Sequence, residues 1–154
     1  MKILFVCLGN IIRSPLAEEI LRQLNRSNPL PYSFEVKSCG LGDWHDGQLP
    51  DKRMRTVAKE RGYVLKSRAQ AFHPEFFDEF DMVFAADHAV LEELKSRTDS
   101  QEPLQKLYLM TEFSKAHQGQ DVPDPYYYDR VTFERAYDMI ENSCIGIMSY
   151  LREK

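Results

Sequence analysis

Short apolar runs alternate with amphipathic stretches along this chain of 154 residues, and this alternation constrains the fold more than any other feature. Residues 3–6, Ile-Leu-Phe-Val, form a continuous apolar run that is typical of a strand buried on both faces of a parallel sheet. Further strands are expected at residues 34–38, 81–85 and 107–109. Apolar residues at helical spacing predict helices from Pro15 up to Asn28, over 51–61, after Asp87, and over 133–151.

The order strand, helix, strand, helix, strand, helix, strand, loop, helix predicts an α/β fold. We expect three layers, with a central four-stranded parallel sheet flanked by helices. No linker, repeat or low-complexity segment interrupts the chain, so residues 1–154 are expected to form a single domain. Ligands of such sheets bind beyond the carboxyl ends of the strands. The segment from Cys7 to Ser14 follows the first strand at such an end.

Charge and cysteine content narrow the classes of function. The formal net charge is −4, with 20 basic and 24 acidic residues, whereas a nucleic-acid partner requires a basic face. Cys7, Cys39 and Cys144 are too few for a disulfide framework and lack zinc-site spacing, which fits a reducing compartment. The apolar opening is too short for a signal peptide or a membrane span. We therefore expect a cytoplasmic protein with no nucleic-acid or membrane partner.

A nucleophile and an arginine stand close together in the segment Cys7-Leu8-Gly9-Asn10-Ile11-Ile12-Arg13-Ser14. The intervening residues can form a loop whose N–H groups surround an anion, and the following helix adds its positive N-terminal end. Arg13 supplies a fork that matches two phosphate oxygens. These positive surroundings favour the thiolate of Cys7, the form that attacks phosphorus. The segment therefore predicts a phosphate-binding loop formed by Leu8, Gly9, Asn10, Ile11, Ile12, Arg13 and Ser14.

Other residues of the loop have predicted supporting roles. Gly9 lets the backbone turn tightly and approach the anion. Ser14 can steady the thiolate with its hydroxyl, and Asn10 is a scaffold residue whose side chain can bond to Ser14 or Ser38. A cysteine five residues before an arginine often arises by chance, with the cysteine simply buried at the end of a strand. Its position between an apolar strand and a helix favours the functional interpretation.

The sequence closely resembles the low-molecular-weight protein tyrosine phosphatases over nearly its whole length. Three segments carry the resemblance: Val6–Pro15 matches the signature loop, Ser38–Gly47 a second motif and Asp124–Tyr127 a third. On its position alone, Asp124 between two prolines is more typical of a turn. The resemblance implies instead that it is the general acid, which a thiolate mechanism needs as a separate proton donor.

The resemblance implies the remaining chemistry as well. Cys7 would attack phosphorus and form a phosphocysteine, while Arg13 and the loop amides would bind the phosphate. No metal or cofactor is implied, because the arginine and the amides balance the charge. A slot for a phosphotyrosine ring would be lined by Leu8, Ile11, Trp44, Tyr126 and Tyr127. The implied activity is hydrolysis of phosphotyrosine in proteins or peptides, and of small aryl phosphates, by a monomer or weak dimer.

The chain departs from the family pattern at three positions. Many members carry a second cysteine where Ile12 stands, so a protective disulfide with the nucleophile is not expected here. Ser67 stands where some members have histidine, and Gln70 where arginine is common, which leaves the bracing of Asn10 open.

Asp87 is expected to cap a helix and could also bond to the phosphate loop. The four histidines, His45, His73, His88 and His117, show no ligand spacing.

Two other functions remain as alternatives. A thiol-dependent arsenate reductase shares this fold and loop, but it needs a relay of further cysteines, and the chain offers only Cys39 and Cys144. A phosphotyrosine-binding module without turnover would need a broken catalytic set, whereas Cys7, Arg13 and Asp124 are all present. Hydrolysis of phosphotyrosine is the favoured prediction.

Overall fold

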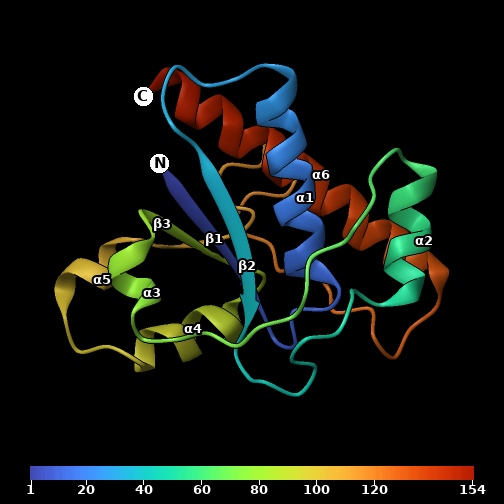
Figure 1. Ribbon diagram of the computed structural model, residues 1–154, viewed down its shortest axis with the longest axis horizontal. Coiled ribbons are helices and arrows are strands. Elements are labelled where there is room, and N and C mark those ends of the chain that lie inside the picture. Colours follow the sequence, from blue (N-terminus) through green and yellow to red (C-terminus); the bar gives the residue numbers. More distant parts are fainter.

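The computed structural model describes residues 1–154 and has a four-stranded sheet at its centre (Figure 1). The strands lie in the order β2-β1-β3-β4, and all neighbours are parallel. Their bounds are β1 (Lys2–Cys7), β2 (Glu35–Gly40), β3 (Met82–Ala85) and β4 (Leu107–Leu109). The helices are α1 (Arg13–Ser27), α2 (Lys52–Glu60), α3 (Phe76–Glu79), α4 (His88–Ser96), α5 (Gln101–Gln105) and α6 (Arg130–Glu153). The predicted α/β class and the parallel four-stranded sheet are confirmed.

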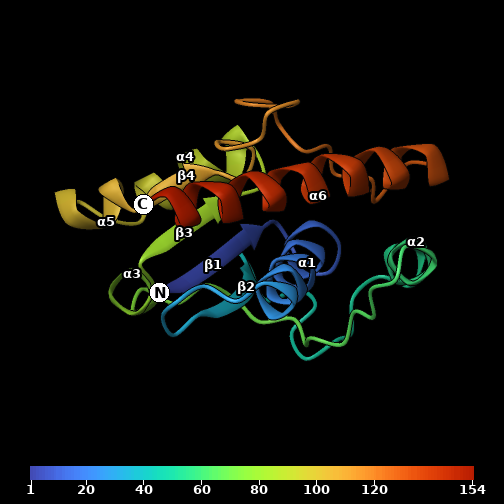
Figure 2. The ribbon, with the colours of Figure 1, turned by 90° about the horizontal axis from the view of Figure 1, so that it is seen from above.

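Helices cover both faces of the sheet because the strands are apolar on both sides. Along β1, Ile3, Phe5 and Cys7 belong to a large core that includes residues of α1, α2 and α6. Leu4 and Val6 point the other way, into a smaller core with α3 and α4. Figure 2 shows α6 extending along the length of the molecule beside the sheet. The expected three layers are therefore present.

Differences from the predicted elements are confined to short segments and ends. Helix α1 begins at Arg13, so Pro15 lies within its first turn. Helices α3 and α5 were not predicted, because four or five residues are too few to show a helical period. Gly62 directly follows the segment 51–61 that was predicted to be helical, and it has a left-handed φ of +94°, which is typical of the residue after a helix. No helix has both the length and the apolar character that crossing a bilayer requires.

The carboxyl end of β2 packs closely against the loop that follows β1. A Cβ atom on Gly40, the last residue of β2, would lie 2.9 Å from the carbonyl oxygen of Leu8 and from the carbonyl carbon of Gly9. Glycine is therefore required where β2 passes the loop that follows β1. Gly40 also forms an isolated bridge with Ala71, which brings the segment before α3 against the same edge.

Candidate active site

The loop between β1 and α1 presents unpaired backbone donors. The N–H groups of residues 8–12 donate no hydrogen bond within the chain. Ile12 precedes the first turn of α1 and gives it no side-chain cap, so the helix N-terminus is also open. Buried N–H groups without partners are costly, and a loop of such groups ahead of a helix is suited to binding an anion.

Asn10 holds the loop in its strained shape. It is the only non-glycine residue with positive φ, at 59°, a conformation that asparagine tolerates better than most residues. Its side-chain nitrogen donates to the hydroxyl oxygens of Ser14 (2.8 Å) and Ser38 (2.9 Å), so both predicted partners are engaged. Its side-chain oxygen accepts from the backbone N–H of Gln70 at 3.0 Å. Gln70 therefore braces Asn10 through its main-chain N–H, which any residue except proline could supply at that position.

Gly9 makes room for a neighbouring side chain, a contact that was not predicted. Its φ is not positive, and the left-handed residue of the loop is Asn10 instead. A Cβ atom on Gly9 would lie 3.0 Å from the ring of His45, so the missing side chain makes room for that ring. Histidine spacing gave no sign of this contact. The position of His45 beside Trp44 in the second motif was the only available signal.

The thiol of Cys7 lies at the carboxyl end of β1, nearly buried, with its sulfur 2.9 Å from the hydroxyl oxygen of Ser14. A hydroxyl at this distance can donate to a thiolate. The other two cysteines take no part in the site. Cys39 and Cys144 are fully buried within the two cores, and burial raises the pKa of both thiols.

The guanidinium of Arg13 is buried and held by three groups. Its Nη1 donates to Asp87 Oδ2 at 2.6 Å and to the carbonyl oxygen of Val122 at 3.0 Å. Asp87 also caps α4 by accepting from the N–H of Val90 at 2.8 Å, so its predicted capping role is confirmed. Its second contact is with Arg13, a residue of the predicted phosphate loop, so the possible bond from Asp87 to that loop is present. The Nη2 group of Arg13 lies 3.7 Å from Asp124 Oδ2.

These neighbours keep the arginine charged. Burial of Arg13 opposes its charge, but the negative charges of Cys7, Asp87 and Asp124, and the bond from Asp87, outweigh this effect and raise its pKa above the ordinary value. A permanently cationic fork beside a thiol is suited to an anionic substrate.

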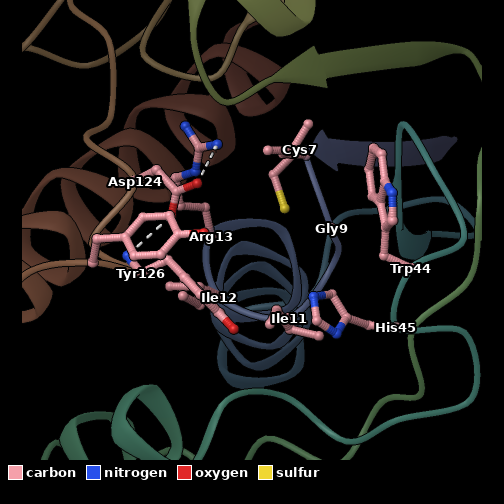
Figure 3. Close-up of a pocket in the computed structure, with 11 residues that line it drawn as sticks. Cys7, Gly9, Ile11, Ile12, Arg13, Trp44, His45, Asp124 and Tyr126 are labelled. Carbon is pink, nitrogen blue, oxygen red and sulfur yellow. Dashed lines mark hydrogen bonds and ion pairs between the residues drawn. The ribbon is translucent and has the colours of Figure 1, made fainter.

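A pocket of about 380 Å³ opens above the thiol. Figure 3 shows the sulfur of Cys7 between Arg13 with Asp124 on one side and Trp44 with His45 on the other. All five predicted slot residues, and all three predicted catalytic residues, line this pocket. Its lining residues are Cys7, Leu8, Gly9, Ile11, Ile12, Arg13, Trp44, His45, Asp124, Tyr126 and Tyr127. Ser14 and Ser38 lie behind the loop, in contact with Asn10.

Two exposed aromatic rings form the outer walls. Trp44 is 64% exposed and Tyr127 is 89% exposed. The indole of Trp44 lies against Gly42, where an added Cβ atom would come within 2.5 Å of the ring. Large rings with this much exposure at the mouth of a pocket are suited to stacking on an aromatic ligand.

Comparison with known proteins agrees with this geometry. A family model described as low molecular weight phosphotyrosine protein phosphatase matches residues 2–154. The chain belongs to this family. A low molecular weight protein-tyrosine-phosphatase of Streptomyces coelicolor is 35% identical over 155 residues, covering 99% of this chain and 94% of that protein.

Solved structures of relatives superpose closely on this phosphatase. A protein tyrosine phosphatase from Entamoeba histolytica, solved with Hepes in the active site, matches with a TM-score of 0.94 and 37% identity. The match covers 99% of this chain and 97% of that one. A Drosophila arginine phosphatase matches with a TM-score of 0.87 and 30% identity, covering 97% of each chain. The chain is thus a hydrolase of the protein tyrosine phosphatase class and acts on phosphotyrosine.

Proposed function

We propose that this phosphatase hydrolyses phosphotyrosine in proteins and peptides with Cys7 as the nucleophile, Arg13 as the phosphate ligand and Asp124 as the general acid and base. The observation that carries the proposal is the convergence of these three side chains on one pocket whose floor is the loop of unpaired N–H groups. Each group has a position that the two-step reaction requires.

In the first step the thiolate sulfur of Cys7 attacks phosphorus, and the bond from phosphorus to the tyrosine oxygen breaks. The N–H groups of residues 8–12 and the fork of Arg13 bind the equatorial oxygens, where negative charge is concentrated in the transition state. The departing oxygen takes its electron pair and receives a proton from Asp124. The products are tyrosine and a phosphocysteine.

In the second step a water molecule attacks the phosphocysteine. Asp124, now a carboxylate, accepts a proton from this water, which reverses its first role. The bond between sulfur and phosphorus breaks, and the sulfur leaves as a thiolate beside the hydroxyl of Ser14. Inorganic phosphate is released and the site returns to its starting state.

The contact between Arg13 and Asp124 is one that substrate would change. Without substrate, the Nη2 group of Arg13 lies 3.7 Å from the Asp124 carboxylate. A bound phosphate would compete with Asp124 for this guanidinium. Binding of substrate would therefore release the Asp124 carboxyl toward the leaving oxygen.

The walls of the pocket favour an aromatic ester. Leu8 and Ile11 in the loop after β1, and Trp44, Tyr126 and Tyr127 in other loops, provide mainly apolar and aromatic surface. A phosphotyrosine ring can stack on such walls, whereas a guanidinium needs several acceptors, and these side chains offer only the two phenol oxygens of the tyrosines. We therefore infer selectivity for phosphotyrosine over phosphoarginine, the substrate class named for the Drosophila relative.

We further infer that residues 1–154 work as one domain, in the cytoplasm, as a monomer or weak dimer without nucleic acid, membrane, metal or cofactor. The net charge of −4 supports the exclusion of nucleic acid, and the three unpaired cysteines support the cytoplasmic compartment. Sedimentation at several concentrations would measure the oligomeric state.

Hydrolysis of matched phosphopeptides tests the proposal. The phosphotyrosine peptide should turn over at mildly acidic pH, and the phosphoserine and phosphoarginine peptides much more slowly. Cys7→Ser should abolish turnover and still bind the phosphotyrosine peptide. Turnover retained by Cys7→Ser, or a preference for phosphoarginine, would contradict it.

A further inference from the structure

Two buried carboxylates lie behind the phosphate loop, on a part of α1 that the reaction does not use. Glu18 is 6% exposed and Glu19 is 5% exposed. Both pair with the same cation, Arg22, whose side chain is one-third exposed at the surface of the molecule. Buried carboxylates are costly unless they are paired and hydrogen-bonded. Two of them beside one arginine leave an excess negative charge that needs an explanation.

The contacts of the two carboxylates differ. One oxygen of Glu18 accepts from the hydroxyl of Ser38 at 2.5 Å, and the other pairs with Arg22 Nη2. Glu19 accepts from Arg22 Nη1 at 2.9 Å and from Gln23 at 2.6 Å, and it makes no contact with Ser38. Only Glu18 therefore reaches the groups that support the loop.

The bonds beyond Glu18 have a fixed direction. A carboxylate can only accept, so the hydrogen of the Ser38 hydroxyl is committed to Glu18. The oxygen of Ser38 then accepts from the side-chain nitrogen of Asn10. The Asn10 amide cannot be reversed without loss, because its oxygen accepts from the N–H of Gln70. The side-chain nitrogen of Asn10 is therefore fixed as the donor, by Ser38 on one side and by the N–H of Gln70 on the other.

The same amide nitrogen determines the direction of the last bond. It donates to the oxygen of Ser14, which leaves the hydroxyl hydrogen of Ser14 free to point elsewhere. The sulfur of Cys7 lies 2.9 Å from this hydroxyl, and the only other acceptor nearby, the carbonyl oxygen of Cys39, is at 3.4 Å. The hydroxyl is therefore directed at the sulfur.

We propose that Glu18 is a positioning residue for the nucleophile, acting through Ser38, Asn10 and Ser14 so that the Ser14 hydroxyl donates to the thiolate of Cys7. Arg22 pairs with the second oxygen of Glu18, which leaves the first oxygen to the Ser38 hydroxyl. Glu18 and Glu19 in turn raise the pKa of Arg22 against the opposing effect of its burial, so Arg22 is cationic. This inference rests on the proposed role of Cys7.

Glu18→Gln tests the proposal, with Glu19→Gln as the matched control. Because Arg22 only donates, it would bind the amide oxygen of the Glu18→Gln variant and turn the amide nitrogen toward Ser38. This nitrogen would compete with Asn10 for the hydroxyl oxygen of Ser38. Glu19→Gln removes the same charge beside the same arginine without touching Ser38.

The measurement is the rate of alkylation of Cys7 by iodoacetamide as a function of pH. Glu18→Gln should move the midpoint upward by about one pH unit, since a hydrogen bond to a charged group is lost or weakened. Its kcat for p-nitrophenyl phosphate should fall by roughly tenfold, with KM changed much less. Glu19→Gln should keep the wild-type midpoint. The nearby charged groups Arg13, Asp87, Asp124 and His45 are unchanged in both variants.

A double-mutant cycle identifies the route. If the effect passes through the hydroxyl of Ser14, Glu18→Gln should cause no further shift in a Ser14→Ala background. Equal shifts for Glu18→Gln and Glu19→Gln, or a shift that persists without the Ser14 hydroxyl, would overturn the proposal.

Thermal unfolding followed by circular dichroism checks that each variant folds. If Glu18→Gln does not fold, Ser38→Ala interrupts the same chain of bonds and should also raise the midpoint; an unchanged midpoint would refute the idea. Failure of the proposed role of Glu18 is distinct from failure of the proposed function. A wild-type midpoint in Glu18→Gln, with Cys7→Ser inactive, would remove only the role of Glu18.

Discussion

The guanidinium Nη2 of Arg13 lies 3.7 Å from Oδ2 of Asp124. One of these residues begins α1 and the other lies in the loop before α6, so the contact joins the phosphate ligand to the proposed acid across the fold. The proposed phosphate-binding group and the proposed acid therefore lie only a few ångströms apart in one pocket.

Asp124→Asn should slow turnover of phenyl phosphate by about 10²–10⁴-fold, because the amide cannot supply a proton to the departing oxygen. Steady-state kinetics with phenyl and p-nitrophenyl phosphate would measure the effect. The loss should be smaller for p-nitrophenyl phosphate, whose leaving group needs less help. Equal rates for wild type and Asp124→Asn on phenyl phosphate would remove the acid role.

Asp87→Asn should reduce kcat/KM for aryl phosphates by about tenfold or more. The amide nitrogen that replaces Asp87 Oδ2 cannot accept the hydrogen bond from Arg13, so the guanidinium is misplaced relative to the phosphate. The amide still offers an oxygen to cap α4, so stability should change little. Asp129→Asn is the control, since Asp129 caps α6 in the same way but has no contact with Arg13. Similar kinetics for both variants would show that Asp87 is only a helix cap.

The stability of the N-terminal end of α2 should depend on pH through Asp51. Burial opposes the charge of this carboxylate, but its bonds to the backbone and side chain of Arg53 outweigh burial and lower the pKa of Asp51. A group with a depressed folded pKa stabilises the fold above its unfolded value, about 3.9, and loses that contribution as the pH falls through the folded value.

Asp51→Ala should therefore lower the free energy of unfolding by about 1 kcal/mol at neutral pH. The difference from wild type should shrink below about pH 4. Urea unfolding between neutral and acidic pH would measure it. A difference that is constant with pH would show that the charge of Asp51 contributes nothing.

Gly146→Ala should destabilise the protein by about 1–3 kcal/mol or more, because a Cβ atom there would lie 1.9 Å from the carbonyl oxygen of Phe113. The neighbouring Ile145 is 49% exposed, so Ile145→Ala should change the free energy of unfolding much less. Urea denaturation of both variants makes the comparison. Similarly small losses of unfolding free energy in both variants would mean that α6 can move away from the segment containing Phe113 without cost.

Peroxide should oxidise Cys7 without forming an intramolecular disulfide. Ile12 offers no thiol, and Cys39, although on the neighbouring strand, belongs to the core on the other face of the sheet. Burial and the nearby charge of Cys7 raise the pKa of Cys39, which makes it a poor partner. Mass spectrometry of the oxidised protein would test this, and a peptide joining Cys7 to Cys39 would disprove it.

The features predicted from sequence are those that depend on local pattern. The run from Ile3 to Val6 identified β1, and the spacing of Cys7 and Arg13 identified the loop, because each signal lies within a few residues. Asp124 needed the family resemblance, since only the fold brings it to Arg13. On its position between two prolines alone, Asp124 was expected only to form part of a turn.

The contacts that the sequence left open join segments that lie far apart in the chain. The ion pair of Asp87 with Arg13 and the brace from Gln70 to Asn10 join segments whose approach is fixed by the order of the strands. The left-handed conformation of Asn10 was not predicted, because glycine is the residue that most often adopts it and nothing local marks Asn10 for it. The positions of side chains behind the loop could be known only from the structure.

Capture of the covalent intermediate tests the central claim most directly. Wild type and Asp124→Ala would be quenched in acid during turnover of p-nitrophenyl phosphate, digested and examined by mass spectrometry. We expect the added mass of one phosphoryl group on the peptide containing Cys7, and none on the peptides containing Cys39 or Cys144. An active enzyme with no phosphate on Cys7, or with phosphate on another residue, would contradict the mechanism.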